Sequence, residues 1–199
     1  MTKFEITTET KDHYSVTLHR IKALRDIPRH GVKTGDLGGW IEKEANLSQD
    51  GDAWIGGNAS VGGNASVWGN ARVWGNARVW GNARVWDDAS VWDDARVWGN
   101  AELTHTQHHI TIGPVGSENI TVTLYRTADG HQVQAGCWGP GTLDELKTEV
   151  KRREKDEWAH RDPADVGRWA AQYKYIRKLG EAVAASWDAE RAAAKAVQA

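Results

Sequence analysis

Three histidines, His105, His108 and His109, are the side chains in this sequence best suited to hold a metal ion. Imidazole nitrogens are common ligands of Zn²⁺, and three of them with one further ligand complete a tetrahedral site. The same run also suits a polar loop that binds nothing, which is the interpretation we favour. We therefore expect no bound metal and no other cofactor.

Two acidic pairs, Asp87-Asp88 and Asp93-Asp94, are the next candidates for chemistry. Carboxylates that face each other can bind calcium. Both pairs stand where neighbouring segments have Gly-Asn, so we favour solvated substitutes at tight turns, which also offset the charge of nearby arginines.

Arginine and tryptophan recur in a pattern that suits binding rather than catalysis. The unit Val-Trp-Gly-Asn-Ala-Arg starts at Val67 and returns, with some replacements, every six residues as far as Val97. A guanidinium beside an indole allows cation–π contact, and such a surface can stack a base, hold a phosphate or bind a protein. Stacked tryptophans can equally be structural. The candidate binding residues are Arg72, Trp74, Arg78, Trp80, Arg84, Trp86, Arg96 and Trp98.

A period of six predicts a solenoid with short strands and tight corners. Side chains alternate along a strand, so Ala71 and Val73 should point inward while Arg72 and Trp74 point outward. Gly-Asn supplies the corner, because glycine tolerates positive φ. A looser form of the pattern runs upstream from Ile41, and the eight residues between Leu47 and Ile55 predict a two-residue bulge.

The repeat resembles the hexapeptide-repeat family of left-handed parallel β-helices, in which an aliphatic residue is followed at the fifth place by a small one. Val73, Ala77 and Val79 match that pattern. The resemblance implies a left-handed solenoid of about four coils. In that family three hexads close one coil, so residues 18 apart stack at the strand spacing of about 4.8 Å.

This stacking sorts the outward residues into three faces. The first face contains Ser60, Arg78, Arg96, Trp80 and Trp98. The second face contains Ser66, Arg84, Glu102, Trp68 and Trp86. The third face contains Trp54, Arg72, Ser90, Trp74 and Trp92. The first face is the most cationic, and we expect it to bind the partner.

Many members of this family are trimeric acyltransferases that bind CoA and use a histidine of the coils as general base. Residues 38–103 contain no histidine, so that base is missing here. We therefore expect no catalysis and keep a CoA-dependent trimeric acyltransferase as an alternative.

The remaining segments predict a cap at the N-terminal end of the solenoid and a separate C-terminal domain. Residues 1–37 alternate as a β cap, residues 38–104 form the β-helix, and residues 105–199 form a β-hairpin with two helices. A capping box, Thr142 to Glu145, opens the first helix, which should run to about Trp158. Asp162-Pro163 opens the second, whose apolar stripe packs as core or joins two chains in a dimer.

Composition narrows the setting. The formal net charge is −2, which gives no bulk attraction to nucleic acid or acidic membranes. The single cysteine, Cys137, excludes an internal disulfide and fits a reducing compartment. No apolar run approaches the length of a membrane span, and the first residues lack an apolar signal core. We expect a cytoplasmic protein.

The whole chain also resembles a group of phage- and prophage-encoded hexapeptide-repeat proteins. The shared segments are Leu18–Arg25, Gly35–Glu44, Ile112–Ser117 and Gly141–Glu145. The resemblance implies an accessory protein in the cytoplasm of a bacterial host. We expect it to bind and block a host or defence protein, with a nucleotide as a possible ligand, and to form a dimer or trimer. A self-assembling structural protein is the second alternative.

Overall fold

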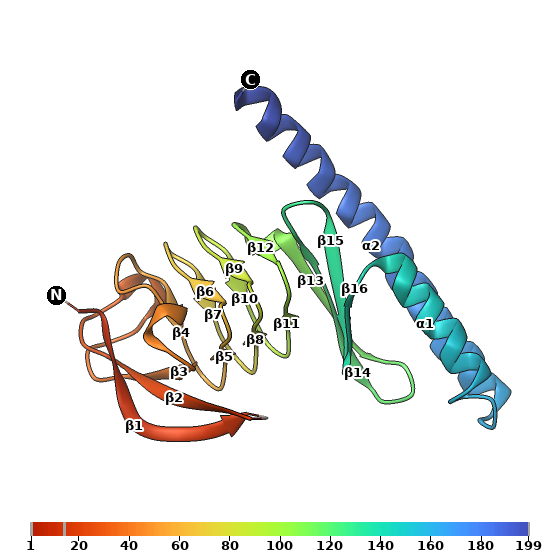
Figure 1. The fold of residues 1–199 in the computed structure, drawn as a ribbon, viewed down its shortest axis with the longest axis horizontal. Helices are drawn as coiled ribbons and strands as arrows, with labels where there is room; N and C mark the ends of the chain where they lie inside the picture. Colours follow the sequence, from red (N-terminus) through yellow and green to blue (C-terminus); the bar gives the residue numbers. More distant parts are fainter. Residues whose placement is uncertain (1, 14, 199) are drawn as a thin grey trace. The chain divides into compact units, whose positions relative to one another are not determined.

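The computed structural model describes residues 2–13 and 15–198. The chain divides into two compact units, Met1–His109 and Ile110–Ala199. The first unit is a parallel β-solenoid of about four turns, and the second combines a small sheet with helices (Figure 1). This mostly β architecture confirms the fold class that the repeat predicts.

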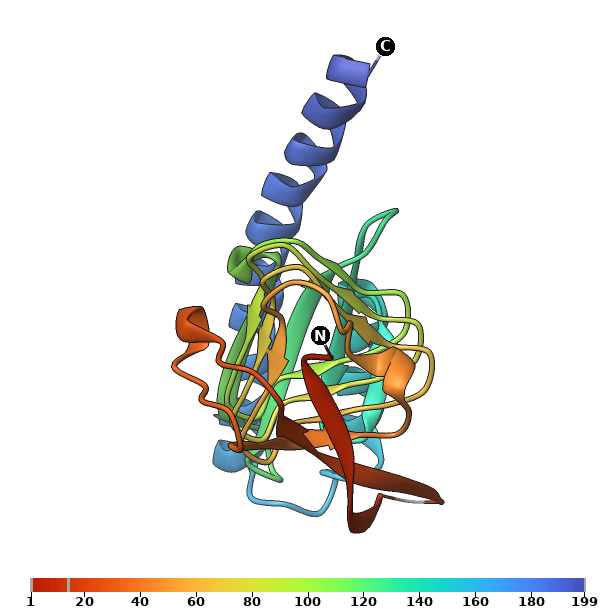
Figure 2. The same ribbon diagram turned by 90° about the vertical axis from the view of Figure 1, so that its left-hand side faces the viewer.

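Three sheets of short parallel strands run along the solenoid, one for each predicted face. The first face contains β3 (Leu37–Ile41), β5 (Ser60–Val61), β8 (Arg78–Val79) and β11 (Arg96–Val97). The second contains β6 (Ser66–Val67), β9 (Arg84–Val85) and β12 (Glu102–Leu103). The third contains β4 (Trp54–Ile55), β7 (Arg72–Val73) and β10 (Ser90–Val91). Figure 2 shows the successive coils lying over one another.

The register confirms the predicted stacking. Arg78 pairs with Arg96, and Arg84 pairs with Glu102, in each case 18 positions apart. The first coil is longer, because Leu47 bridges to Val67, 20 positions away. The two additional residues lie between Leu47 and β4, where the eight-residue spacing predicts a bulge.

Alternation along each strand fills the narrow interior. Ala71 and Val73 are fully buried. Arg72, between them, and Trp74, which follows Val73, point outward and are partly exposed. The corners require positive φ, which Gly69 adopts at 68°. Asp87 and Asp93 take the same place with φ of 52° and 54°. The aspartates therefore substitute for corner glycine, as predicted.

A β-hairpin extends the first face at the start of the chain. Its strands β1 (Phe4–His13) and β2 (Val16–Ala23) are antiparallel, and β2 pairs in turn with β3. The amide of Gln49 binds the backbone of Lys3 at 2.8 Å and that of Phe4 at 3.2 Å, so the lengthened first coil anchors the hairpin. Short 3₁₀ turns, η1 (Pro28–His30), η2 (Glu44–Asn46) and η3 (Thr106–His108), complete this unit.

The second unit places two antiparallel helices on a four-stranded sheet (Figure 1). The strands are β13 (His109–Val115), β14 (Ile120–Arg126), β15 (His131–Ala135) and β16 (Trp138–Gly141). The helices are α1 (Leu143–Lys155) and α2 (Pro163–Gln198). None of the helices in the described part of the chain is long and apolar enough to cross a membrane.

Both predicted helix starts are confirmed. Thr142 Oγ1 accepts a hydrogen bond from the backbone N–H of Glu145, and Glu145 Oε2 accepts one from the N–H of Thr142. Asp162 Oδ1 accepts a hydrogen bond from the N–H of Ala164 at the start of α2. The prediction that the first helix reaches Trp158 is wrong, since α1 ends at Lys155.

The stripe on α2 packs as core within its own unit, which confirms the simpler of the two interpretations. Tyr173, Ile176 and Trp187 are buried together with Val122 and Leu124 of β14. Trp158, beyond the end of α1, joins this core, and its indole N–H donates to Ser117 Oγ at 3.1 Å. Trp158 therefore packs in the core from the segment that follows α1.

The tight fit between an indole and a glycine gives the first prediction. A Cβ on Gly62 would lie 2.5 Å from Cζ3 of Trp80, and Trp80 is buried and cannot swing away. We expect Gly62→Ala to lower the free energy of unfolding by about 1–3 kcal/mol, measured by urea denaturation.

The control is Gly130→Ala, because a Cβ there meets no atom within 4 Å. In a Trp80→Ala background, Gly62→Ala should lose most of its effect. An equal loss of stability with and without the indole would show that this contact is not the cause.

Candidate binding site

The second face is electrostatically balanced. Trp68 and Trp86 stack with ring centroids 5.0 Å apart and an interplanar angle of 3°. Arg84 lies 3.9 Å from Glu102 on the neighbouring strand. Because opposite charges stack here, this face offers a partner little unbalanced charge.

The third face uses its arginine internally. The guanidinium carbon of Arg72 lies over both Trp74 and Trp92, at 4.3 Å and 4.4 Å from the two ring centroids. Trp74 and Trp92 are thus neighbours, as predicted, and the guanidinium of Arg72 contacts both rings. Cation–π contacts contribute about 0.5–2 kcal/mol each, so Arg72 is held within the fold. Trp92 is the most exposed of the six repeat indoles, at 38%.

The first face is partly covered, which corrects one expectation. Trp80 does point away from the coil interior, but only 7% of its surface is exposed. The β1–β2 hairpin lies over it, with the His13 ring centroid 5.2 Å away. Trp80 packs with Leu18 and Trp40 in a small apolar cluster and stacks on Trp98 at 5.8 Å. Trp80 is therefore a supporting residue, and Trp98 is the more accessible indole.

The hairpin brings further positive charge to this face. Lys11 Nζ lies 4.5 Å from the centroid of the Trp40 ring, and the Arg20 guanidinium lies 5.0 Å from it. Burial lowers the pKa of Lys11, and the charges of Arg78 and Arg20 lower it further. Burial also lowers the pKa of His13, with added contributions from Arg78, Lys11 and Arg96. The cations of the hairpin and of the first face thus act on one another.

Little negative charge lies near Lys11 and Arg78. Glu9 lies 3.7 Å from Arg20, and in the described part of the chain no carboxylate comes within ion-pairing distance of Arg78 or Lys11. No carboxylate contributes to the shifted pKa of Lys11 or His13. We call Lys11, Arg20, Arg78 and Arg96, together with the neighbouring His13, the cationic surface; the lowered pKa of His13 leaves its ring mostly neutral at pH 7. The repeat pattern identifies its two repeat arginines, whereas nothing in the pattern points to the three hairpin residues.

The acidic corners do not face each other. Asp88 accepts a hydrogen bond from Asn70 Nδ2 at 3.2 Å and pairs with Arg29. Asp94 accepts one from Asn76 Nδ2 at 3.2 Å. Asn82 donates in the same way to Asn100 along the remaining corner. These contacts make the second corner residue part of a ladder between coils, with each carboxylate in a different ladder.

The three candidate metal-binding histidines are arranged for packing. The rings of His105 and His108 meet edge to face at 5.2 Å, and His108 Nδ1 accepts from the N–H of Thr104 at 3.2 Å. Burial lowers the pKa of His109 to about 4, with a smaller contribution from His108, against the opposing hydrogen bond with the Thr106 backbone. Over residues 2–13 and 15–198, no three His, Cys, Asp or Glu side chains are grouped to hold a metal ion.

Comparison with known protein families finds no match for the chain, and no curated protein matches it.

The low pKa of His109 gives a pH prediction. An unfolded histidine has a pKa of about 6.5, so between pH 6.5 and 4 the unfolded chain binds more protons than the folded chain. The free energy of unfolding should therefore fall as the pH falls through this window, by up to about 3 kcal/mol from this residue. Urea denaturation at several pH values measures this fall.

His109→Gln should reduce the slope of this pH dependence, to which His13, His30 and His131 also contribute because burial lowers their pKa values. His105→Gln, at an exposed position of the same loop, should leave the slope unchanged. If the two variants keep the same slope, His109 is not the group responsible.

Proposed function

We propose that this chain is a binding protein without catalytic activity, and that its cationic surface binds an acidic surface of a partner protein. The observation that carries the proposal is the convergence of Lys11, His13 and Arg20 of the hairpin with Arg78 and Arg96 of the first face. A supporting indole, Trp98, borders the group.

Electrostatics favour an anionic partner. Arg78 and Arg96 are directly paired on neighbouring strands, which lie about 4.8 Å apart. Two like charges that project from adjacent strands repel each other, by an amount that falls as water screens them. A carboxylate from a partner relieves this repulsion and gains charge-assisted hydrogen bonds.

We also propose the biological setting that the resemblance implies. The segments Leu18–Arg25 and Gly35–Glu44 support a phage or prophage accessory protein that acts in the cytoplasm of a bacterial host. Its partner would be a host or defence protein, bound by a dimer or trimer of this chain. Arg20, within the first segment, is a member of the cationic surface, which links the shared motif to the proposed site.

A nucleotide is the second candidate ligand, because the partly exposed Trp98 ring can stack a base while Arg96 meets a phosphate. The acyltransferase alternative lacks a coil histidine for the general base. The self-assembling alternative is supported only by the exposure of Trp92 on the third face.

Charge reversal tests the surface directly. We expect Arg78→Glu with Arg96→Glu to weaken binding of fluorescein-labelled poly-L-glutamate by roughly tenfold or more, measured by fluorescence anisotropy. A matched control, Arg84→Glu with Lys33→Glu, makes the same change in net charge at exposed positions outside the cationic surface. Unchanged binding in the first variant, or equal losses in both, would falsify the assignment of the surface.

The same variant tests whether the charges are adjacent. Because Arg78 and Arg96 lower the pKa of His13, replacing both with glutamate should raise that pKa. An NMR titration of the His13 ring protons measures the change. A pKa that does not move would place these arginines too far from the hairpin to act with it.

Native mass spectrometry of protein purified gently from bacterial lysate distinguishes the function classes. We expect to find the chain in a complex with a second protein. The double variant Arg78→Glu with Arg96→Glu should no longer form this complex. A trimer carrying a CoA-sized mass would instead support the acyltransferase, and a bare oligomer would support self-assembly.

A further inference from the structure

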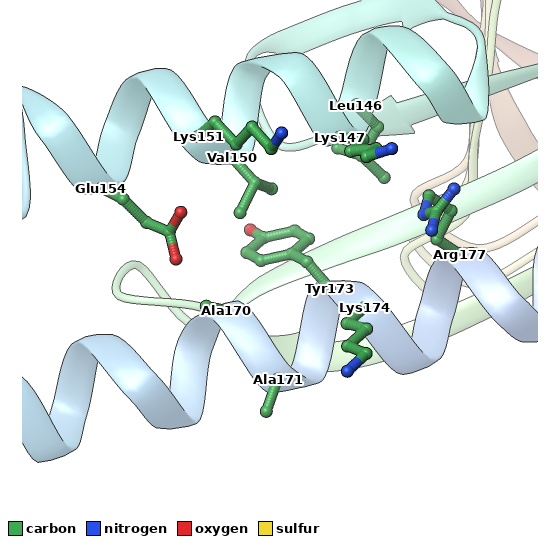
Figure 3. Close-up of a pocket in the computed structure, with 10 residues that line it drawn as sticks. All are labelled: Leu146, Lys147, Val150, Lys151, Glu154, Ala170, Ala171, Tyr173, Lys174 and Arg177. Atoms are coloured by element: carbon green, nitrogen blue, oxygen red, sulfur yellow. The ribbon is translucent and has the colours of Figure 1, made fainter.

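The second unit contains a groove between α1 and α2 that the proposed function does not use. Its volume is about 460 Å³, and Figure 3 shows it as a gap between the two antiparallel helices with the Tyr173 ring at its floor. Leu146 and Val150 of α1 supply the rest of the apolar floor. Ala170 and Ala171 supply a low wall on α2, because alanine side chains are short.

Positive charge dominates the rim of this groove. Lys147 and Lys151 lie on α1, and Lys174 and Arg177 lie on α2 (Figure 3). The one carboxylate that lines the groove belongs to Glu154, at the end opposite Arg177.

Only some of these rim cations form ion pairs with carboxylates of the same chain. Arg177 pairs with Glu181 at 2.8 Å, whereas within the described residues no carboxylate lies in ion-pairing distance of Lys147, Lys151 or Lys174. Three lysines at the rim of the groove therefore have no carboxylate among the described residues to offset their charge.

We propose that this groove binds an acidic amphipathic helix of a partner protein. An amphipathic helix lays its apolar face into such a groove between two helices, and small residues allow its backbone to approach closely. Glutamates or aspartates on both sides of its apolar seam would meet the lysines on both walls, as flanking charges do in helical coiled coils.

The distribution of the cations favours a helix over a single anionic amphiphile such as a fatty acid. Lys147 and Lys151 are one helical turn apart on one wall, and Lys174 and Arg177 are about one turn apart on the other. One headgroup needs cations that converge on a point, whereas a helix presents charges along both edges of its seam.

A second copy of this chain does not offer the required helix. Its α1 mixes five lysines and arginines with four carboxylates, and Glu149 already pairs with Arg152 and Arg153 of the same helix. In the last turns of α2, Asp188 pairs with Arg191 of the same helix, and Lys195 follows. Neither helix presents two acidic edges, so charge complementarity points to a different protein.

The experiment uses the full chain and two synthetic peptides of about 16 residues with the same leucine seam, one flanked by glutamates and one by lysines. Fluorescence anisotropy measures their binding. We expect the glutamate peptide to bind at least roughly tenfold more tightly than the lysine peptide. Equal affinities, or no binding of the glutamate peptide, overturn the proposal.

Two charge-reversed variants locate the binding. Lys147→Glu with Lys174→Glu changes one lysine on each wall and should weaken binding of the glutamate peptide by roughly tenfold or more. Lys178→Glu with Lys195→Glu makes the same charge change at exposed positions that do not line the groove, and should leave binding within about twofold. Equal losses in the two variants indicate non-specific attraction and overturn the proposal.

A third variant, Ala171→Phe, fills the groove without changing charge and should also remove binding. Far-UV circular dichroism checks that each variant remains folded, and Ala171→Phe keeps the test decisive if a charge reversal unfolds the chain. If the protein forms a dimer and the double variant Lys147→Glu with Lys174→Glu dissociates it, the occupant of the groove is a second copy of the chain. Binding of decanoate with the same dependence on these variants, and none of the peptide, would put an alkyl carboxylate there. Either result overturns the proposed occupant.

Discussion

Parallel, in-register stacking is the constraint on which the first unit depends. Each outward side chain lies beside the one 18 positions later, so a repeated arginine meets whatever the next coil carries. The three faces resolve this differently. Arg84 meets Glu102, Arg72 inserts its charge between two indoles, and Arg78 meets Arg96. Only the first face therefore stacks positive on positive, and the hairpin adds further cations there. This stacking of like charge is the reason that we propose an acidic partner for the first face.

Much of this arrangement follows from the sequence, and the reasons are local. A six-residue period with alternating small and branched residues leaves one way to pack the narrow interior, so inward and outward positions, the three faces and the corner residues are predictable. The capping box from Thr142 to Glu145 is equally local, because both of its hydrogen bonds lie within four consecutive residues. The packing of Trp158 is not local, since its indole contacts Ser117, 41 positions earlier in the chain.

The hairpin shows why the candidate site was only half predictable. In β1, the side chain of Phe4, at an even-numbered position, is buried. Further along the same strand, the odd-numbered residues Lys11 and His13 lie on the side that is paired with Leu18 and Val16. The change follows from an irregularity in pairing between Ile6 and Thr10, which alternation alone does not reveal. The groove in the second unit was missed for a related reason. The stripe on α2 identifies the core residues, but the gap beside Ala170 and Ala171 depends on where α1 lies.

The formal net charge of −2 conceals a separation of charge within the chain. In the repeats, four aspartates occupy corners, where Asp88 and Asp94 accept hydrogen bonds from the asparagines of the preceding coil. Cations occupy the flat faces and the rim of the α1–α2 groove. The net charge of the chain therefore gives no general attraction to a polyanion. It is still compatible with a local site that binds carboxylates.

This separation also changes the role of the tryptophans. Trp74 and Trp80 cover glycines of the preceding coil, since a Cβ on Gly56 or Gly62 would collide with their rings. Of the six repeat indoles, only Trp92 has more than a third of its surface exposed. The indoles therefore act first as covers for the coil backbone and as low-dielectric surroundings that strengthen nearby charges. Specificity for a partner then depends on the positions of the cations, which differ between the three faces, rather than on the indoles, which all three faces share.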